Sequence, residues 1–192
     1  MAKNRVIDSC QMLMIGGSTG SIEVLLQLLP ALKTPLPFAL VLVIHRKNTA
    51  DSTLVNLLAL KTDIPLQEVD DKDAILPGTI YLAPADYHLL IEQDKTFSLD
   101  DSEKINYSRP SIDVTFESAA DVYGPSLVGI LLSGANTDGT AGLNAIKNAG
   151  GVTVVQKPET AQVPFMPQQA IEGAPIDWVL DVKEMEGFIN DE

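Results

Sequence analysis

The sequence is poor in the residues that build disulfides, metal sites and nucleic-acid surfaces. It has one cysteine, Cys10, and two histidines, His45 and His88, so an internal disulfide and a zinc-ligand spacing are both excluded. Only 13 residues are Lys or Arg against 26 Asp or Glu, and the resulting net charge of −13 repels phosphate backbones and anionic lipid surfaces. We therefore expect no bound metal and no nucleic-acid partner, and we expect Cys10 to be a bystander.

Long hydrophobic runs are also missing. No stretch approaches the roughly 20 apolar residues that cross a bilayer, and the N-terminus lacks the apolar core and cleavage site of a signal peptide. These absences predict a cytoplasmic protein without membrane insertion. A chain of 192 residues that is 45% hydrophobic is long enough to bury a two-faced sheet, and we expect residues 1–192 to form a single domain.

Short apolar runs that alternate with helical patterns predict the fold. The runs typical of strands buried on both faces of a parallel sheet are residues 12–15, 38–44, 126–132 and 152–155. Shorter alternating segments, expected to form an antiparallel hairpin, are residues 79–82, 88–91 and 96–99. Together these patterns predict an α/β fold with a doubly wound, mostly parallel sheet flanked by helices, plus a β-hairpin excursion.

Ser18 lies in the motif Gly16-Gly17-Ser18-Thr19-Gly20, directly after the first predicted strand and before a helical pattern. Glycines permit a tight turn that exposes the serine hydroxyl at the sheet edge, as in a nucleophile elbow. The helix that follows aims its free N–H groups at the turn and favours an anion there. The turn alone leaves a nucleophilic serine and a purely structural turn equally open, whereas nucleotide-binding glycine spacings are absent.

His45 ends the second predicted strand, and Asp138 lies in the loop after the third. Loops at the carboxyl ends of neighbouring parallel strands face one crevice, so we expect Ser18, His45 and Asp138 to meet there. Imidazole can take a serine proton at neutral pH, and a carboxylate can hold the imidazole in the required tautomer. Two simpler roles stay open: closure of its strand by His45 through a loop hydrogen bond, and capping of the next helix by Asp138. His88 is expected to be a half-exposed strand residue.

Several ordered sequence blocks resemble the catalytic domain of the chemotaxis protein-glutamate methylesterases, the CheB family. The blocks are residues 15–20, the strand ending in His45, residues 76–78 with 81–84, residues 109–113, residues 134–139 and residues 166–171. The resemblance runs from about residue 12 to residue 180. It implies that Ser18 is the nucleophile, His45 the base and Asp138 its orienting partner, with no cofactor.

The resemblance also implies the substrate. It is a glutamate methyl ester on the cytoplasmic helices of methylated chemoreceptors, with deamidation of glutamines as a second activity. The backbone N–H groups of Thr19 and Ala135 match the oxyanion hole, although Ala135 and Asn136 stand where the family has methionine and glycine. Family members commonly carry a receiver domain in front. Here the first predicted strand begins about a dozen residues from Met1, so we expect a stand-alone catalytic domain.

Candidates for the substrate groove are Arg46, Arg109, Ser111, Phe165 and Met166. Arg46 and Arg109, with Lys47, would form a basic rim suited to a carboxylate-rich receptor helix, although Lys47 fits an ordinary solvated charge slightly better. Ser111 is also expected to cap a helix that starts at Ile112. For Phe165 and Met166, core packing is an equal alternative. Two other functions stay open: a catalytically weakened binding or adaptor module on this scaffold, and a hydrolase of another ester.

Overall fold

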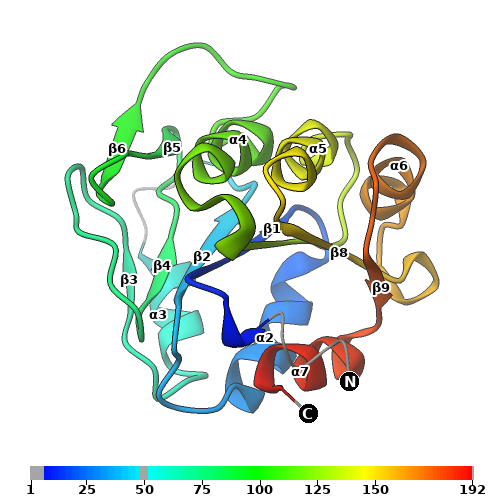
Figure 1. Cartoon of the computed structure of the whole chain (residues 1–192), viewed down its shortest axis with the longest axis horizontal. Helices are drawn as coiled ribbons and strands as arrows, with labels where there is room; N and C mark the ends of the chain where they lie inside the picture. Colours follow the sequence, from blue (N-terminus) through cyan, green and yellow to red (C-terminus); the bar gives the residue numbers. More distant parts are fainter. Residues whose placement is uncertain (1–6, 48–51, 192) are drawn as a thin grey trace.

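A seven-stranded parallel sheet forms the centre of the molecule in the computed structural model, which describes residues 7–47 and 52–191 (Figure 1). In spatial order the strands are β3 (Leu66–Glu68), β4 (Ile80–Leu82), β2 (Ala39–Ile44), β1 (Met12–Gly17), β7 (Leu127–Leu131), β8 (Val152–Gln156) and β9 (Trp178–Leu180). Every neighbouring pair is parallel. β1, β2 and β7 are buried at every residue, as their continuous apolar runs predict.

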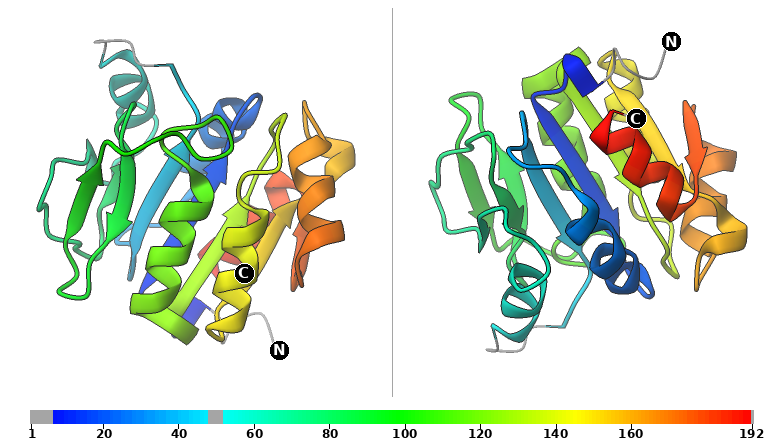
Figure 2. Two further views of the ribbon diagram at one scale, coloured as in Figure 1. Left: turned by 90° about the horizontal axis from the view of Figure 1, so that it is seen from above. Right: turned by 90° about the horizontal axis from the view of Figure 1, so that it is seen from below.

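Helices cover both faces of this sheet (Figure 1, Figure 2). One face carries α2 (Ser21–Ala31), α3 (Thr53–Ala59) and α7 (Val182–Asn190), and the other carries α4 (Ile112–Tyr123), α5 (Thr140–Asn148) and α6 (Phe165–Gly173). Successive strand residues point to opposite faces. Leu13 and Ile15 therefore pack with the first group of helices, and Met12 and Met14 with the second. This confirms the doubly wound α/β prediction. Two 3₁₀ turns, η1 (Gly124–Ser126) and η2 (Pro158–Thr160), complete the helical segments.

A separate antiparallel hairpin, β5 (His88–Ile91) and β6 (Phe97–Asp100), packs its apolar side chains against α4. The prediction that residues 79–82 belong to this hairpin is wrong, because β4 pairs with β2 and β3 in the main sheet. All three β4 residues are buried, which suits a strand with a covered surface on both faces. The sequence patterns also did not identify β3 and β9, which have only three residues each.

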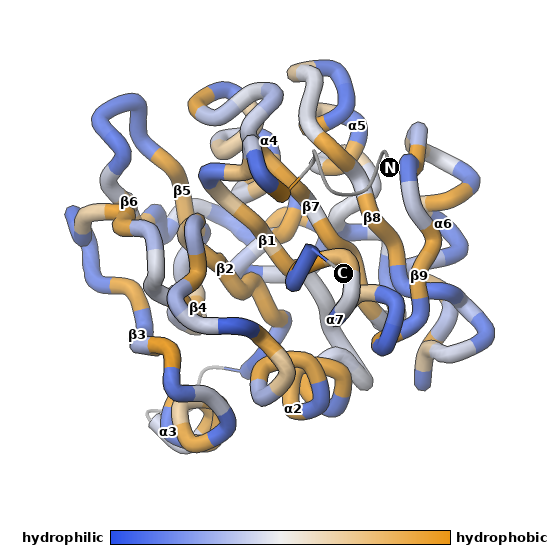
Figure 3. The backbone as a smooth tube through the Cα atoms, turned by 60° about the horizontal axis from the view of Figure 1, so that its bottom comes forward, coloured by the Kyte–Doolittle hydropathy of each residue, from blue (hydrophilic) through white to orange (hydrophobic). Residues whose placement is uncertain are grey.

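Apolar residues concentrate in the strands, as the hydropathy colouring shows (Figure 3), and apolar residues of the helices pack with them in two clusters, one on each face of the sheet. Among residues 7–47 and 52–191, no helix is both long and apolar enough to span a bilayer. The same residues contain no group of three or more His, Cys, Asp or Glu side chains that could hold a metal ion. Cys10 is buried beneath β1, where burial raises the pKa of its thiol to about 12.

The chain changes direction around β1, the middle strand of the sheet. After β1 it continues through α2 on one face, whereas after β7, the neighbouring strand, it continues through α5 on the other face. Connections that diverge in this way leave a crevice at the carboxyl ends of the two strands, and ligands of open α/β sheets bind in such crevices. The candidate residues that follow β1, β2 and β7 all lie at this edge.

Candidate active site

Ser18 occupies a tight turn whose backbone is held from both sides. Its N–H donates to the Ser133 carbonyl at 2.9 Å, and its own carbonyl accepts from the Ser21 N–H at 3.0 Å and the Ser21 hydroxyl at 2.5 Å. Gly20 precedes α2 with a φ of 85°, a left-handed conformation that glycine adopts without steric cost. The Ser18 hydroxyl is half-buried and makes no hydrogen bond within the described residues. The turn therefore fixes the serine and leaves its hydroxyl available.

Strand register places His45 beside Ser18. Gly17 pairs with Ile44 across β1 and β2, and the His45 N–H continues the ladder by donating to the Gly17 carbonyl at 3.0 Å. Ser18 and His45 are thus the next two neighbours on strands spaced about 4.8 Å apart. The structure brings the two residues together through the backbone, and the imidazole ring makes its hydrogen bonds to Asp138 and Ser108.

Asp138 anchors the imidazole. Its Oδ2 lies 2.6 Å from Nε2 of His45, and the aspartate side chain is completely buried while that of the histidine is 10% exposed. The same carboxylate accepts hydrogen bonds from the Ser111 hydroxyl at 3.0 Å, the Ile112 N–H at 2.7 Å and the Asp113 N–H at 2.9 Å. These three donors belong to the first turn of α4. Asp138 therefore sits at the N-terminus of α4, and the simpler role of capping the helix that follows it is not observed.

The hydrogen bonds on Asp138 decide the protonation of the pair. Burial acts to raise the pKa of this carboxyl, but the hydrogen bond with His45 and the Asp113 and Ile112 N–H groups outweigh burial and hold the pKa below its usual value. An ionised carboxylate only accepts, so Nε2 of His45 carries a proton toward it. In the neutral imidazole Nδ1 is then the basic nitrogen, and it lies 3.4 Å from the Ser108 hydroxyl.

A second carboxylate, Asp113, makes the reciprocal connection. It belongs to α4, and its Oδ1 accepts from the Gly139 N–H at 2.8 Å and the Gly142 N–H at 2.7 Å at the start of α5. Asp113 of α4 therefore accepts from N–H groups at the start of α5, and Asp138, just before α5, accepts from N–H groups at the start of α4. Burial raises the pKa of Asp113 to about 6; the negative charge of Asp138 acts in the same direction, and the Gly142 N–H opposes it. This crossed pair fixes the loop that carries Asp138.

The N–H groups proposed for the oxyanion hole lie on the two loops that meet at Ser18. Thr19 and Ala135 are exposed, and neither N–H meets an acceptor within the described part of the chain. Gly134, just before Ala135, is so close to the turn that a Cβ there would lie 2.9 Å from the Ser18 Cβ and 2.6 Å from the Met166 Cε. The loops after β1 and β7 thus touch, and both candidate donors stay free.

A buried polar cluster, absent from the sequence predictions, joins these loops. The Ser133 hydroxyl donates to the Thr19 carbonyl at 2.7 Å and accepts from the Val163 N–H at 2.9 Å, while the Ser133 N–H donates to Oε1 of Gln156 at 3.0 Å. Ser133 and Gln156 are fully buried. In the sequence, the only sign of these residues is their polarity: Ser133 follows an apolar run, and Gln156 ends one. They hold the turn after β1 against the loop after β7.

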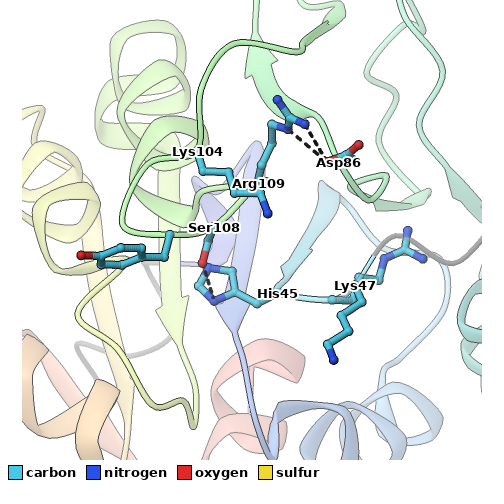
Figure 4. A pocket seen from close by; sticks show the side chains of 8 residues that line it. His45, Lys47, Asp86, Lys104, Ser108 and Arg109 are labelled. Carbon is cyan, nitrogen blue, oxygen red and sulfur yellow. Dashed lines mark hydrogen bonds and ion pairs between the residues drawn. The ribbon is translucent and has the colours of Figure 1, made fainter.

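Arg46 and Arg109, both predicted groove residues, line a cavity of about 410 Å³ beside His45 (Figure 4). Both are already paired. Arg46 donates to the Glu68 carboxylate and to the Ala83 carbonyl, and Arg109 donates to Asp86 at 2.7 Å. Their charges are therefore largely compensated within the protein, which reduces the basic rim expected from the sequence.

The remaining sequence predictions have different outcomes. Ser111 and Met166 are fully buried, so the groove positions predicted for them are not supported, while Phe165 is 44% exposed at the start of α6. Ser111 caps α4 as predicted, accepting from the Val114 N–H. The half-exposed position predicted for His88 is wrong: it is 1% exposed, its Nδ1 accepts from the Ser111 N–H, and its Nε2 donates to the Glu103 carbonyl. A strand pattern could not reveal this histidine's position beneath the α4 terminus.

Comparison with known proteins assigns this arrangement to a family. The family model described as CheB methylesterase matches residues 13–189. The chain belongs to the CheB methylesterase family. It is thereby one of the carboxylic ester hydrolases.

Individual relatives agree with this assignment. A relative from Leptospira interrogans is 43% identical over 173 residues, covering 90% of each chain. The protein-glutamate methylesterase/protein-glutamine glutaminase of Thermotoga maritima is 33% identical over 175 residues, covering 90% of this chain and 51% of the relative. The chain thus spans about half the length of several curated relatives. The crystal structure of the Thermotoga maritima CheB methylesterase catalytic domain matches with a TM-score of 0.90 at 31% identity, covering 95% of this chain and 98% of that one.

Proposed function

We propose that this chain hydrolyses glutamate methyl esters on chemoreceptor proteins through Ser18, His45 and Asp138. The observation that carries the proposal is the 2.6 Å hydrogen bond between the buried Asp138 carboxylate and His45, because a carboxylate that holds an imidazole is what a serine nucleophile on the neighbouring strand end requires. The relatives named protein-glutamate methylesterase support the substrate, and the glutaminase part of their name supports deamidation of receptor glutamines as a second activity.

The proposed reaction begins with transfer of the Ser18 proton to Nδ1 of His45. The Ser18 oxygen forms a bond to the ester carbonyl carbon, and the N–H groups of Thr19 and Ala135 stabilise the oxyanion. The intermediate collapses by breaking the bond to the methoxy oxygen, which takes the proton from His45 and leaves as methanol. Asp138 stabilises the imidazolium while it carries the positive charge.

Water completes the cycle. His45 removes a proton from a water molecule, the resulting hydroxide attacks the acyl carbon, and the bond to Ser18 breaks as His45 returns the proton to the serine. The free glutamate carboxylate is released. The proposed step requires rotation of the Ser18 side chain toward Nδ1, because Asp138 holds the His45 ring in place and the two residues follow paired strand positions.

We also propose the partner and the cellular compartment of the enzyme. Its partners are the cytoplasmic helices of methylated chemoreceptors, and we place the reaction in the cytoplasm, with residues 1–192 acting as one catalytic domain. The names of the relatives support a protein substrate with esterified glutamates, and the match to an isolated catalytic domain supports a single catalytic domain. No cofactor takes part in the proposed steps.

Two measurements test the proposal. A fluorophosphonate probe should label Ser18, identified by peptide mass spectrometry, and His45→Ala should abolish the labelling. Methanol release should be observed from methylated receptor and should exceed release from a small ester. Folded protein that no probe labels would indicate an adaptor, and equal release from both esters would indicate a different substrate.

A further inference from the structure

Four cationic side chains line the cavity beside His45, although the chain as a whole has a net charge of −13. Its lining includes Arg46, Lys47, Lys104 and Arg109 but only one carboxylate, Asp86 (Figure 4). The cations come from two separate segments, one directly after β2 and one between β6 and α4. A cluster of positively charged side chains on a protein of net negative charge requires a specific explanation.

The two arginines and the two lysines are not equivalent. Arg46 is 12% exposed and pairs with Glu68, and Arg109 is 19% exposed and pairs with Asp86. Arg109 also donates to the carbonyls of Asp101 and Ser102, at 2.7 and 2.8 Å. The arginines are therefore held by the protein and shape the cavity wall.

Lys47 and Lys104 are exposed and pair with no carboxylate within the described residues. Both ammonium groups are available to an incoming molecule. A neutral methyl ester does not need them, because in the proposed reaction the N–H groups of Thr19 and Ala135 stabilise its carbonyl oxygen. The lysines therefore fit a part of the substrate other than the reacting ester.

We propose that Lys47 and Lys104 bind a carboxylate side chain of the substrate that neighbours the esterified glutamate. The inference rests on the proposed function, which places the ester at Ser18. On a helical substrate, side chains three or four residues apart are about 5–6 Å from each other, so one can enter the cavity while the other lies at the nucleophile. A volume of about 410 Å³ accommodates a glutamate side chain with its hydration. The cavity thus selects acidic segments.

A binding experiment tests the pocket without requiring turnover. The Ser18→Ala protein is titrated with two fluorescent helical peptides that carry one glutamate methyl ester and differ only in having Glu or Gln three and four residues away. We expect about five-fold tighter binding of the Glu peptide at low salt, since exposed ion pairs contribute up to roughly 1 kcal/mol. The preference should shrink at about 0.5 M salt and disappear when Lys47→Met and Lys104→Met are added.

Lys61→Met provides the matched control. This exposed lysine follows α3, which runs from the carboxyl edge of the sheet back toward the start of β3, so it lies away from the cavity. The control should keep the Glu preference, and circular dichroism should show that the double lysine variant is folded. Equal binding of both peptides by the Ser18→Ala protein would overturn the pocket proposal, as would a preference that survives loss of both lysines.

Methanol release tests the proposed function independently of peptide binding. Methanol release from the two peptides by the unmodified protein should show the same preference in kcat/KM. A Glu preference in binding without methanol release would leave the pocket intact and reject the esterase proposal. Methanol release without any Glu preference would reject the pocket and leave the esterase proposal intact.

Discussion

The two halves of the candidate site are built in opposite ways. In the base half, the Asp138 carboxylate is fully buried and accepts hydrogen bonds from His45, Ser111, Ile112 and Asp113. In the nucleophile half, the Ser18 hydroxyl makes no hydrogen bond within the described residues, and the N–H groups beside it are exposed. The contrast has a physical reason. A buried charge needs hydrogen bonds from the protein before substrate arrives, whereas the atoms that contact the substrate must stay without protein partners.

The base half is also where the fold places two acidic groups close together. Asp113 and Asp138 would repel each other in an apolar interior, yet both lie at helix N-termini, where N–H groups favour negative charge. The effect on the two carboxyls differs, since the pKa of Asp138 falls while that of Asp113 rises to about 6. Substitutions in the two halves therefore separate their contributions to activity and stability.

Ser18→Ala should remove turnover while leaving the fold unchanged. Loss of the nucleophile in a serine hydrolase costs on the order of 10⁴-fold or more in kcat, and among the described residues the side chain has no hydrogen bond to lose. Methanol release and thermal unfolding measure the two effects. The matched control is Ser108→Ala, which removes the other hydroxyl near Nδ1 of His45 and should lower kcat by no more than about threefold. If the Ser108 variant is the inactive one, the assignment of the nucleophile is wrong.

Asp138→Asn should reduce kcat by about 10³- to 10⁴-fold, because an amide no longer fixes the imidazole tautomer, as in the serine-protease precedent. It should also lower the free energy of unfolding by about 1–3 kcal/mol, since an amide cannot accept all the hydrogen bonds of the carboxylate. Asp177→Asn serves as the control. Asp177 is paired with Lys147 far along the sheet and should affect stability alone. Retained activity in the Asp138 variant would contradict a role for the base half.

Ser111→Ala should have an intermediate effect. The helix α4 loses its N-cap, at about 1 kcal/mol of stability, and Asp138 loses one of its donors. We expect kcat to fall by about tenfold or less, with little change in KM, because Ser111 is buried and does not contact substrate. Urea unfolding and kinetics on the same preparation test this. A large change in KM with constant kcat would instead restore Ser111 to the groove.

Asp113→Asn should alter the pH dependence of stability more than its value at one pH. The pKa of Asp113 is about 6 in the folded protein against an ordinary 3.8, so the folded state binds more protons between these values. The free energy of unfolding therefore decreases through this carboxyl as pH rises from about 4 to about 6. Asparagine keeps an acceptor for the Gly139 and Gly142 N–H groups and should remove that decrease. Unfolding curves at pH 4, 5, 6 and 7 for both proteins measure it; identical slopes would contradict the raised pKa.

The sequence allowed the central fold and the outline of the site to be predicted for physical reasons. Continuous apolar runs reveal buried parallel strands, and the carboxyl ends of such strands meet at one edge, which is how Ser18, His45 and Asp138 could be grouped. What it could not reveal were contacts between distant segments. Nothing local to Ser111 indicates a bond to a residue 27 positions away, and Asp113 gives no sign that it caps α5.

The errors have the same origin. Residues 79–82 are a short apolar segment after a Pro-Gly turn, and such a segment suits a hairpin or a parallel strand equally well until its neighbours are known. His88 alternates with apolar residues as an exposed strand residue would, and only the α4 terminus above it explains its burial. Arg46 and Arg109 read as free cations in sequence because Glu68 and Asp86 approach them only after folding.

The position of Cys10 offers a practical advantage for studying these loops. The only thiol of the chain is buried and has a pKa of about 12, so almost none of it is the reactive thiolate at neutral pH. Maleimide and iodoacetamide reagents should leave it unmodified in the folded protein. A cysteine introduced at an exposed position such as Phe165 can therefore carry a single fluorophore or spin label without first removing the native one.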